Sequence, residues 1–152
     1  MKHASIITAI LVLLACAGSV QAQEWTSEQL EVWNRVAECT GFAVGQNLDG
    51  LLDCVHDDFS GFLYGDPVPR GKDSFTALVP YFIENMKVAA HEMRPVAIIV
   101  RGDMAVVHYY GFTVYEGSME ISQDKWTDVL VREDGVWRWI ADHGGDLPAD
   151  GE

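Results

Sequence analysis

Apolar residues between Trp25 and Val44 recur at helical spacing. In the segment Trp25–Val44, Leu30 and Trp33 begin one such face, as in an amphipathic helix. Thr26 precedes it, and Gln29 follows three residues later, so the two can form a capping box. The pattern predicts a long first helix that buries one face.

A short second helix is predicted to begin at Asn47 and to end at His56-Asp57-Asp58. Phe59–Tyr64 then has the composition of a short strand. Residues 65–71 contain two prolines and two glycines and are predicted to form a loop.

The third helix is predicted to begin near Lys72. Its apolar residues keep to one face, at Phe75, Leu78, Val79, Phe82 and Met86. Pro80 lies inside this segment, and a proline in a helix interior costs about 3 kcal/mol. We therefore expect a kink or a break there.

The rest of the chain alternates apolar and polar residues between turn signals, as strands do. Four strands are predicted, at residues 88–100, 104–115, 120–132 and 136–143. Asp134-Gly135, between the last two, is the strongest hairpin signal in the chain. Three helices followed by a strand meander predict an α+β fold, with the helices covering one face of a strongly curved antiparallel sheet.

The last hairpin can be given a register. A two-residue turn at Asp134-Gly135 pairs Glu133 with Val136. Continuing this register sets Trp137, Trp139, Ala141 and His143 opposite Arg132, Leu130, Asp128 and Trp126, with all eight on one face. Both faces are partly apolar, so the pattern leaves open which one turns inward.

The first 22 residues have the pattern of a secretory signal peptide. A basic start, a short apolar run at Ile6–Leu14 and the cleavage-like Val20-Gln21-Ala22 follow in order. The apolar run is too short to span a bilayer as a helix. We therefore expect a signal peptide at 1–22, one folded domain at 23–146 and a flexible tail at 147–152.

The leader predicts export to the periplasm or the medium, with no membrane attachment after cleavage. The alternative is a lipid anchor at Cys16, because Leu13-Leu14-Ala15-Cys16 resembles a bacterial lipobox. Leu14 is a poor residue two positions before such a cysteine, so we favour soluble export.

The formal charge of the chain is −13, and no basic stripe is present. Nucleic acid and anionic membrane surfaces are therefore not expected partners. Solubility is the simplest interpretation of the excess acid.

Cys39 and Cys54 remain after removal of the leader. In an oxidising compartment such a pair can form a disulfide, which would close a loop of about 15 residues and contribute ~3 kcal/mol. Two buried free thiols in facing helices are the alternative, and we favour the disulfide slightly.

Several segments together resemble the nuclear transport factor 2-like superfamily, in particular its SnoaL-like branches. Residues 47–52 and 56–59 are similar to the second helix of that family and its exit, and Gly71 to a common position before the third helix. Residues 126–129, 134–138 and 142–143 resemble its last hairpin. Their order and spacing carry the resemblance.

The resemblance implies a cone-shaped fold, in which a bent sheet wraps the helices and leaves a cavity at the wide end. It also implies that a homodimer through the outer sheet face is common among relatives. Members include isomerases, cyclases, dehydratases and non-catalytic binding domains, so the fold does not fix the function.

The residues that the ketosteroid isomerases of this superfamily use are not reproduced here. Aligning residues 48–50 with the family places Cys39 where those enzymes have a tyrosine, and Leu63 or Tyr64 near their aspartate. Asp66 lies two or three residues too far along. The resemblance therefore does not support that activity through those positions.

The candidate binding residues are polar or aromatic groups on the predicted strands. In the second strand His108 and Tyr110 share a face with bulky apolar residues, a mixture that suits an apolar ligand held by a few polar groups. The full candidate set is Tyr64, His108, Tyr110, Trp126, Asp128 and His143.

Among these, His108, Asp128 and His143 are the catalytic candidates. Histidine titrates near neutral pH, and a buried aspartate can do so when its pKa is raised. The alternative is that both histidines are structural and that Asp128 is a solvated strand residue.

No cofactor or metal is predicted. His56-Asp57-Asp58 and His91-Glu92 are ligand types without a recognised zinc spacing. The first hypothesis is therefore an exported protein that binds a small, largely apolar molecule in the cone. A lyase or isomerase using His and Asp as acid and base is the second, and a dimeric scaffold with a vestigial cavity is the third.

Overall fold

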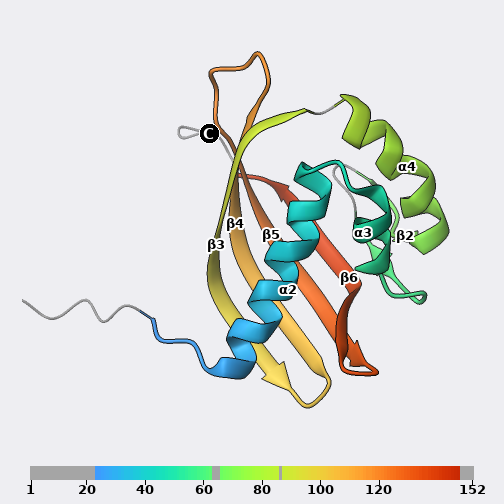
Figure 1. Ribbon diagram of the computed structural model, residues 1–152, viewed down its shortest axis with the longest axis vertical. Helices are drawn as coiled ribbons and strands as arrows, with labels where there is room; N and C mark the ends of the chain where they lie inside the picture. The colour runs from blue at the N-terminus through green and yellow to red at the C-terminus, as the bar shows by residue number, and fades with distance from the viewer. Residues whose placement is uncertain (1–22, 63–65, 86, 148–152) are drawn as a thin grey trace, which may run out of the picture.

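The computed structural model describes residues 23–62, 66–85 and 87–147. Three helices and two very short strands precede a four-stranded antiparallel sheet (Figure 1). The elements are α2 (Ser27–Val44), α3 (Leu48–Asp53), β1 (Ser60–Gly61), β2 (Arg70–Gly71), α4 (Lys72–Asn85), β3 (Val88–Arg101), β4 (Met104–Tyr115), β5 (Ser122–Glu133) and β6 (Val136–Asp146). The predicted α+β order is confirmed. The expected leader, with Cys16, and the candidate residue Tyr64 lie outside the described residues.

The first helix begins as its sequence predicts. The Thr26 side chain accepts a hydrogen bond from the Gln29 backbone N–H, and the Gln29 side chain accepts one from the Thr26 backbone N–H. This reciprocal pair satisfies two donors that the first turn of a helix otherwise leaves open. The same Gln29 side chain donates to the Ile98 carbonyl at 2.6 Å, which attaches the start of α2 to β3.

Of the kink or break expected at Pro80, the break does not occur, because α4 runs through that residue as one helix. The carbonyl that Pro80 cannot bond belongs to Thr76, which is exposed, so water can satisfy it. In addition, the end of the predicted loop at 65–71 forms β2, which pairs with β1.

The large sheet has the strand order β3-β4-β5-β6, so each strand pairs with its sequence neighbour. The predicted turn at Asp134-Gly135 is confirmed: both residues have positive φ, and Glu133 pairs with Val136. Both angles suit the tight hairpin turn that Asp-Gly favours. Figure 1 shows α2 lying across one face of this sheet, with α3 and α4 beyond it on the β6 side.

The core has two parts. One lies between α2 and the sheet, where Val32 and Val36 meet Val107, Leu130 and other buried residues. The other, around Val55 and Phe59, packs α3 and α4 against each other. Trp139 packs against both clusters, so β6 joins them.

Candidate functional site

The face of the sheet that packs on α2 carries the smaller side chains of β4. Ala105, Val107, Tyr109, Gly111 and Thr113 are all buried, whereas the residues between them are partly or largely exposed. Since side chains alternate along a strand, this settles which face turns inward. His108 and Tyr110, chosen as candidates, therefore lie on the outer face.

A bulge in β6 changes the predicted register. Leu130 pairs with Trp139 as expected, but Val129 then pairs with Ala141, so one residue of β6 is left over. Such an extra residue shifts all later side chains to the opposite face. Asp128 therefore pairs with Asp142, not with Ala141.

The same shift moves His143. It pairs with Thr127 on the outer face, and Gly144 occupies the predicted place opposite Trp126. The inner face thus gains Asp142 and loses His143.

Four aspartates of β5 and β6 consequently occupy inner-face positions: Asp128 opposite Asp142, and Asp124 opposite the exposed Asp146. Asp128 is 2% exposed and Asp124 is 5% exposed, a degree of burial that is rare for acidic residues. We call Asp124, Asp128 and Asp142 the interior acid row.

Glycines make room for the row. The Asp142 carboxyl lies against Gly61 of β1, and the Asp124 carboxyl lies against Gly111, its partner in β4. A β-carbon at either glycine would collide with the acid. The close approach of carboxyl to backbone therefore depends on the missing side chain.

Burial changes the protonation of the central pair. It raises the pKa of Asp128 to about 8, and the charge of Asp142 adds to this rise. Burial also raises the pKa of Asp142 to about 7. Two neighbouring carboxyls that are shielded from water resist double ionisation, so the protonated form of Asp128 is favoured.

Tyr109 and Trp139 approach the Asp128 carboxyl. As hydrogen-bond donors they lower its pKa, in opposition to burial. In turn burial, followed by the Asp128 charge, raises the pKa of Tyr109 well above its usual value, which keeps its hydroxyl protonated. Even so, Asp128 Oδ2 and Trp139 Nε1 complete no hydrogen bond of ordinary geometry.

Among the described residues, four buried side-chain nitrogen or oxygen atoms have no hydrogen-bond partner. They are Asp128 Oδ2, Asp142 Oδ1, Trp139 Nε1 and His91 Nε2. Buried polar atoms are nearly always paired in native proteins, so such a group is what a bound molecule or ordered water would satisfy. Three of these four atoms belong to Asp128 of β5 and to Asp142 and Trp139 of β6.

His91 belongs to a second polar group, farther along the inner face. Its Nδ1 lies 3.0 Å from the Thr113 hydroxyl, and Trp126 Nε1 donates to Asp124 Oδ1 at 2.9 Å. Burial lowers the pKa of His91, while the Asp124 charge opposes this effect. The imidazole is thus favoured in its neutral form.

A separate groove of about 260 Å³ lies on the outer face. His108 Nδ1 is 2.8 Å from the Thr127 hydroxyl at its floor. His143 also lines it and meets the Phe62 ring edge-on, with the ring centroids 5.6 Å apart. Tyr110 and Trp126 complete the candidate residues in its wall.

The candidate set is thus divided between the faces. Asp128 lies inside, Trp126 packs against the inner core and borders the outer groove, and His108, Tyr110 and His143 line that groove. Tyr109, Asp142, Trp139 and His91 were not among the candidates. The small side chains around Tyr109 were the available signal for its face, whereas nothing in the strand pattern marks the bulge that brings in Asp142.

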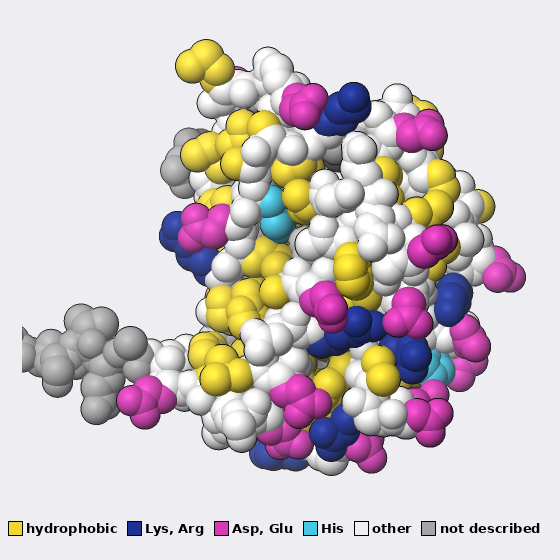
Figure 2. Space-filling view, in the orientation of Figure 1, with side chains coloured by type: hydrophobic (Ala, Val, Ile, Leu, Met, Phe, Trp, Pro, Cys, Tyr) yellow, Lys and Arg dark blue, Asp and Glu magenta, His cyan; other side chains and the backbone are white. Residues whose placement is uncertain are grey.

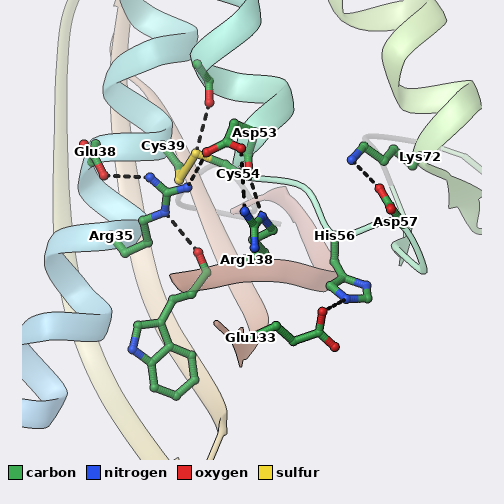
Figure 3. Close-up of polar contacts among 12 residues, drawn as sticks. Arg35, Glu38, Cys39, Asp53, Cys54, His56, Asp57, Lys72, Glu133 and Arg138 are labelled. Carbon is green, nitrogen blue, oxygen red and sulfur yellow. Dashed lines mark hydrogen bonds and ion pairs between the residues drawn. A yellow bond between two sulfur atoms is a disulfide. The ribbon is translucent and has the colours of Figure 1, made fainter. Parts of the chain in front are cut away.

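Polar contacts hold the bulged strand against the helices (Figure 3). Arg35 of α2 donates to the Trp137 carbonyl at 3.0 Å and pairs with Asp53 of α3 at 3.4 Å. Arg138 of β6 donates to the Asp53 carbonyl at 3.2 Å. These contacts fix α2, α3 and β6 relative to one another.

A disulfide between Cys39 and Cys54 lies beside these contacts (Figure 3). Cys54 also accepts a backbone hydrogen bond from Trp139, at 2.8 Å, and His56 N–H donates to the Trp139 carbonyl at 2.8 Å. Cys54 thus connects the disulfide to Trp139, the residue just before the bulge in β6, through one backbone hydrogen bond.

Within the described ranges, no group of three or more His, Cys, Asp or Glu side chains could hold a metal ion. In the same residues no helix is both long and apolar enough to cross a membrane.

A family model described as the SnoaL-like domain matches residues 22–149. The chain belongs to the SnoaL-like domain family. This confirms the resemblance drawn from the sequence. No curated protein matches this SnoaL-like chain in sequence.

Solved structures with the nuclear transport factor 2-like fold resemble this SnoaL-like protein. One of unknown function from Pseudomonas putida has a TM-score of 0.69 and 17% identity, covering 86% of this chain and 93% of that one. A candidate dehydratase from Streptomyces avermitilis has a TM-score of 0.71 and 16% identity, with 81% and 98% covered. At these identities the likeness establishes the fold alone.

A third similar structure is a ketosteroid isomerase-like protein from Erwinia carotovora atroseptica. Its TM-score is 0.69 at 12% identity, and the match covers 82% of this chain and all of that one, 100%. Solved structures that share the fold thus include one described as isomerase-like and one described as a dehydratase, beside one of unknown function.

Proposed function

We propose that this protein is an acid–base enzyme of the isomerase or lyase kind, which moves a proton at the carbon next to a carbonyl group of a small organic substrate. The observation that carries the proposal is the buried pair Asp128 and Asp142, opposite each other in the sheet with their pKa values raised to about 8 and about 7. Pairs of titratable groups with separated pKa values are typical of acid–base sites.

The two acids suit different roles. Asp142, with the lower pKa, is the base that takes a proton from the carbon beside the carbonyl. Asp128, with the higher pKa, stays protonated and donates a hydrogen bond to the carbonyl oxygen, as does the Tyr109 hydroxyl. Negative charge moves onto that oxygen as the proton leaves.

The step balances without a cofactor. The C–H electron pair becomes the new C=C bond of an enol or enolate, and the carbonyl electrons move to the oxygen held by the donors. Asp142 then returns its proton to a different carbon, giving an isomer, or a leaving group departs from the next carbon, giving an elimination. Both outcomes use the same first step.

The test is exchange of carbon-bound hydrogen. Small ketones ranging from acetone to acetophenone are incubated with the protein in deuterated water, and loss of the proton signal beside the carbonyl is followed by NMR. We expect accelerated exchange for at least one ketone and a loss of about 10²–10⁴-fold in Asp142→Asn. His108→Ala, on the outer face, is the control that keeps the activity.

Two results would contradict the proposal. One is no acceleration for any ketone of the series. The other is an Asp142→Asn variant as active as the parent, which would remove the base from its assigned place.

The outer groove supports a second candidate function, binding of a small molecule without catalysis. It combines two imidazoles, a hydroxyl and aromatic walls, a mixture suited to ligand binding. Mass spectrometry of molecules that copurify from the native host tests this. His108→Ala and His143→Ala should lose the molecule while Asp142→Asn keeps it; retention in both histidine variants would exclude the groove as its site.

A further inference from the structure

The outer groove has a lining whose charge is opposite in sign to that of the chain. The whole sequence carries a formal charge of −13. The described residues that line the groove nevertheless include a lysine, Lys125, and two imidazoles, His108 and His143, and no aspartate or glutamate. Groups that can carry positive charge are therefore gathered at one place on an acidic protein.

Strand alternation separates these groups from the nearest acids in sequence. Asp124, Asp142 and Asp146 occupy inner-face positions on β5 and β6. Successive side chains of a strand lie on opposite faces, so Lys125 and His143 lie on the outer face. The acids beside them in sequence thus lie on the other side of the sheet.

Two rows of side chains cross the groove from β4 to β6. The strand pairings place the first row at His108, Thr127 and His143, and the second, two residues along each strand, at Tyr110, Lys125 and Gly145. The rows are about 7 Å apart, and each spans about 10 Å across the three strands. Donors from both rows can therefore reach one small molecule.

Gly145 leaves open space beside Lys125. A β-carbon at Gly145 would meet nothing within 4 Å. Its partner Lys125 is exposed and forms no ion pair with another described residue. The ammonium group of Lys125 is therefore available to a ligand that occupies this space.

His108 adds a second donor. Its Nδ1 lies 2.8 Å from the Thr127 hydroxyl. When that hydroxyl donates to Nδ1, the ring proton is on Nε2, which can then donate to a ligand. An ammonium group and an imidazole N–H are both suited to a carboxylate, which accepts short, charge-assisted hydrogen bonds.

We infer that the outer groove binds a small aromatic carboxylate, whose carboxylate group accepts hydrogen bonds from Lys125 and His108 and whose ring lies along the aromatic wall. This inference rests on the second candidate function and adds the charge class of its ligand. The groove volume of about 260 Å³ is just below the about 300–1,000 Å³ of common ligand pockets and suits a molecule with one ring. A neutral ligand forgoes the charge-assisted bonds, and a cation meets Lys125 as a like charge.

Three probes of similar size separate the charge classes: benzoate, benzamide and benzylammonium. Their binding to the intact protein near neutral pH is followed by NMR through the imidazole C–H signals of His108 and His143. We expect benzoate to bind at least about threefold more tightly than benzamide and about tenfold more tightly than benzylammonium, a modest difference because Lys125 is exposed.

Two variants and a matched control locate the binding. Lys125→Gln should remove the difference between benzoate and benzamide, whereas Lys87→Gln, at another exposed lysine, should leave it unchanged. Gly145→Leu fills the open space beside Lys125, so it should weaken the binding of both benzoate and benzamide.

The outcomes distinguish this inference from groove binding as such. Benzamide or benzylammonium binding as tightly as benzoate overturns the charge class, while binding in the groove stands. Equal effects of Lys125→Gln and Lys87→Gln overturn the role of Lys125, and unchanged binding in Gly145→Leu removes the ligand from the groove. If none of the probes shifts the imidazole signals at millimolar concentration, as when a second copy of the chain covers the groove, the groove function and the charge class both fail.

Discussion

Asp128 is the residue on which the site depends. It is almost completely buried, it pairs across the sheet with Asp142, and Tyr109 and Trp139 approach it as hydrogen-bond donors. Water would hydrate an exposed aspartate and favour its charge, whereas this environment favours the neutral acid. The proton that it retains makes Asp128 a hydrogen-bond donor near neutral pH.

This predicts how stability depends on pH. The pKa of Asp128 is about 8 in the folded protein and ~3.9 in an unfolded chain, so folding takes up a proton between these values. The stability that this proton uptake provides is complete below the unfolded value and is lost as the pH rises through about 8. Asp142 acts in the same direction up to a pH of about 7.

The Asp128→Asn variant tests this dependence. Because its amide cannot ionise, its free energy of unfolding should fall less than that of the parent between pH about 5 and about 9. The difference should reach a few kcal/mol at the upper end, since each pKa unit corresponds to about 1.4 kcal/mol. Urea denaturation at several pH values measures it, and parallel curves for the two proteins would refute the buried proton.

The same pair predicts a narrow pH optimum for catalysis. Activity requires Asp142 ionised and Asp128 protonated, so kcat/KM should rise through pH about 7 and fall through about 8. Ketone exchange rates across this range provide the profile. An exchange rate that stays constant from pH about 5 to about 9 would contradict the roles of Asp142 as base and Asp128 as acid.

At the scale of single residues, the sequence predicted some members of the site and not others. Asp128 was a candidate because a buried strand aspartate can have a raised pKa, and the structure does bury it. Tyr109 was passed over because its neighbours are small, although small side chains under a packed helix are what that face requires. Asp142 could not be found, since the bulge that turns it inward leaves no mark in the alternating pattern.

Among the elements, β6 determines the geometry of the site. Its first half continues the register set by the Asp134-Gly135 turn, and its second half is displaced by one residue. β1 lies beside this second half, where Phe62 N–H donates to the Asp142 carbonyl at 3.0 Å. The turn was predictable from two residues, whereas the bulge depends on contacts with α3 and β1.

Glycine substitutions test the packing of the acids at this scale. Gly61→Ala places a β-carbon against the Asp142 carboxyl and the Phe59 ring, so it should displace the acid and lower both activity and stability. Gly41→Ala in α2 meets nothing within 4 Å and should stabilise the protein by about 1 kcal/mol. Thermal unfolding and ketone exchange compare the two; full activity in Gly61→Ala would refute the close contact.

The disulfide is an element-scale constraint. It closes a segment of 15 residues in sequence between α2 and the end of α3. Replacing Cys39 and Cys54 by serine together should cost ~3 kcal/mol, through the greater freedom of the unfolded chain. Denaturation of the double variant measures this loss, and unchanged stability would show that the cross-link contributes nothing. We propose that the bond forms after export, in an oxidising compartment.

For the whole molecule, the order of helices and strands was predictable because each element carries its own periodicity. Which face of the sheet is buried was not, since both faces are partly apolar and only the docking of α2 decides between them. The acidic side chains lie in two environments, the surface and the interior. Figure 2 shows acidic side chains spread over the visible surface, whereas Asp124 and Asp128 are buried.

The outer face of the sheet exposes large apolar side chains, including Val96, Ile99, Met104 and Tyr110. We propose that this face forms a homodimer, as the resemblance implied. Sedimentation should give a dimer that Ile99→Lys converts to a monomer, while Val68→Lys, at an exposed position near β2, has no effect. A parent protein that sediments as a monomer would exclude the dimer and leave the outer groove open to small ligands.

The most direct test of the central claim is a titration of the aspartate carboxyl carbons by ¹³C NMR, with Asp128→Asn and Asp142→Asn used to assign the signals. Two interior carboxyls should titrate near pH 7 and 8, and removal of either partner should change the pKa of the other. If both titrate near the ordinary aspartate value of ~3.9, the interior holds no shared proton and the acid–base site does not exist.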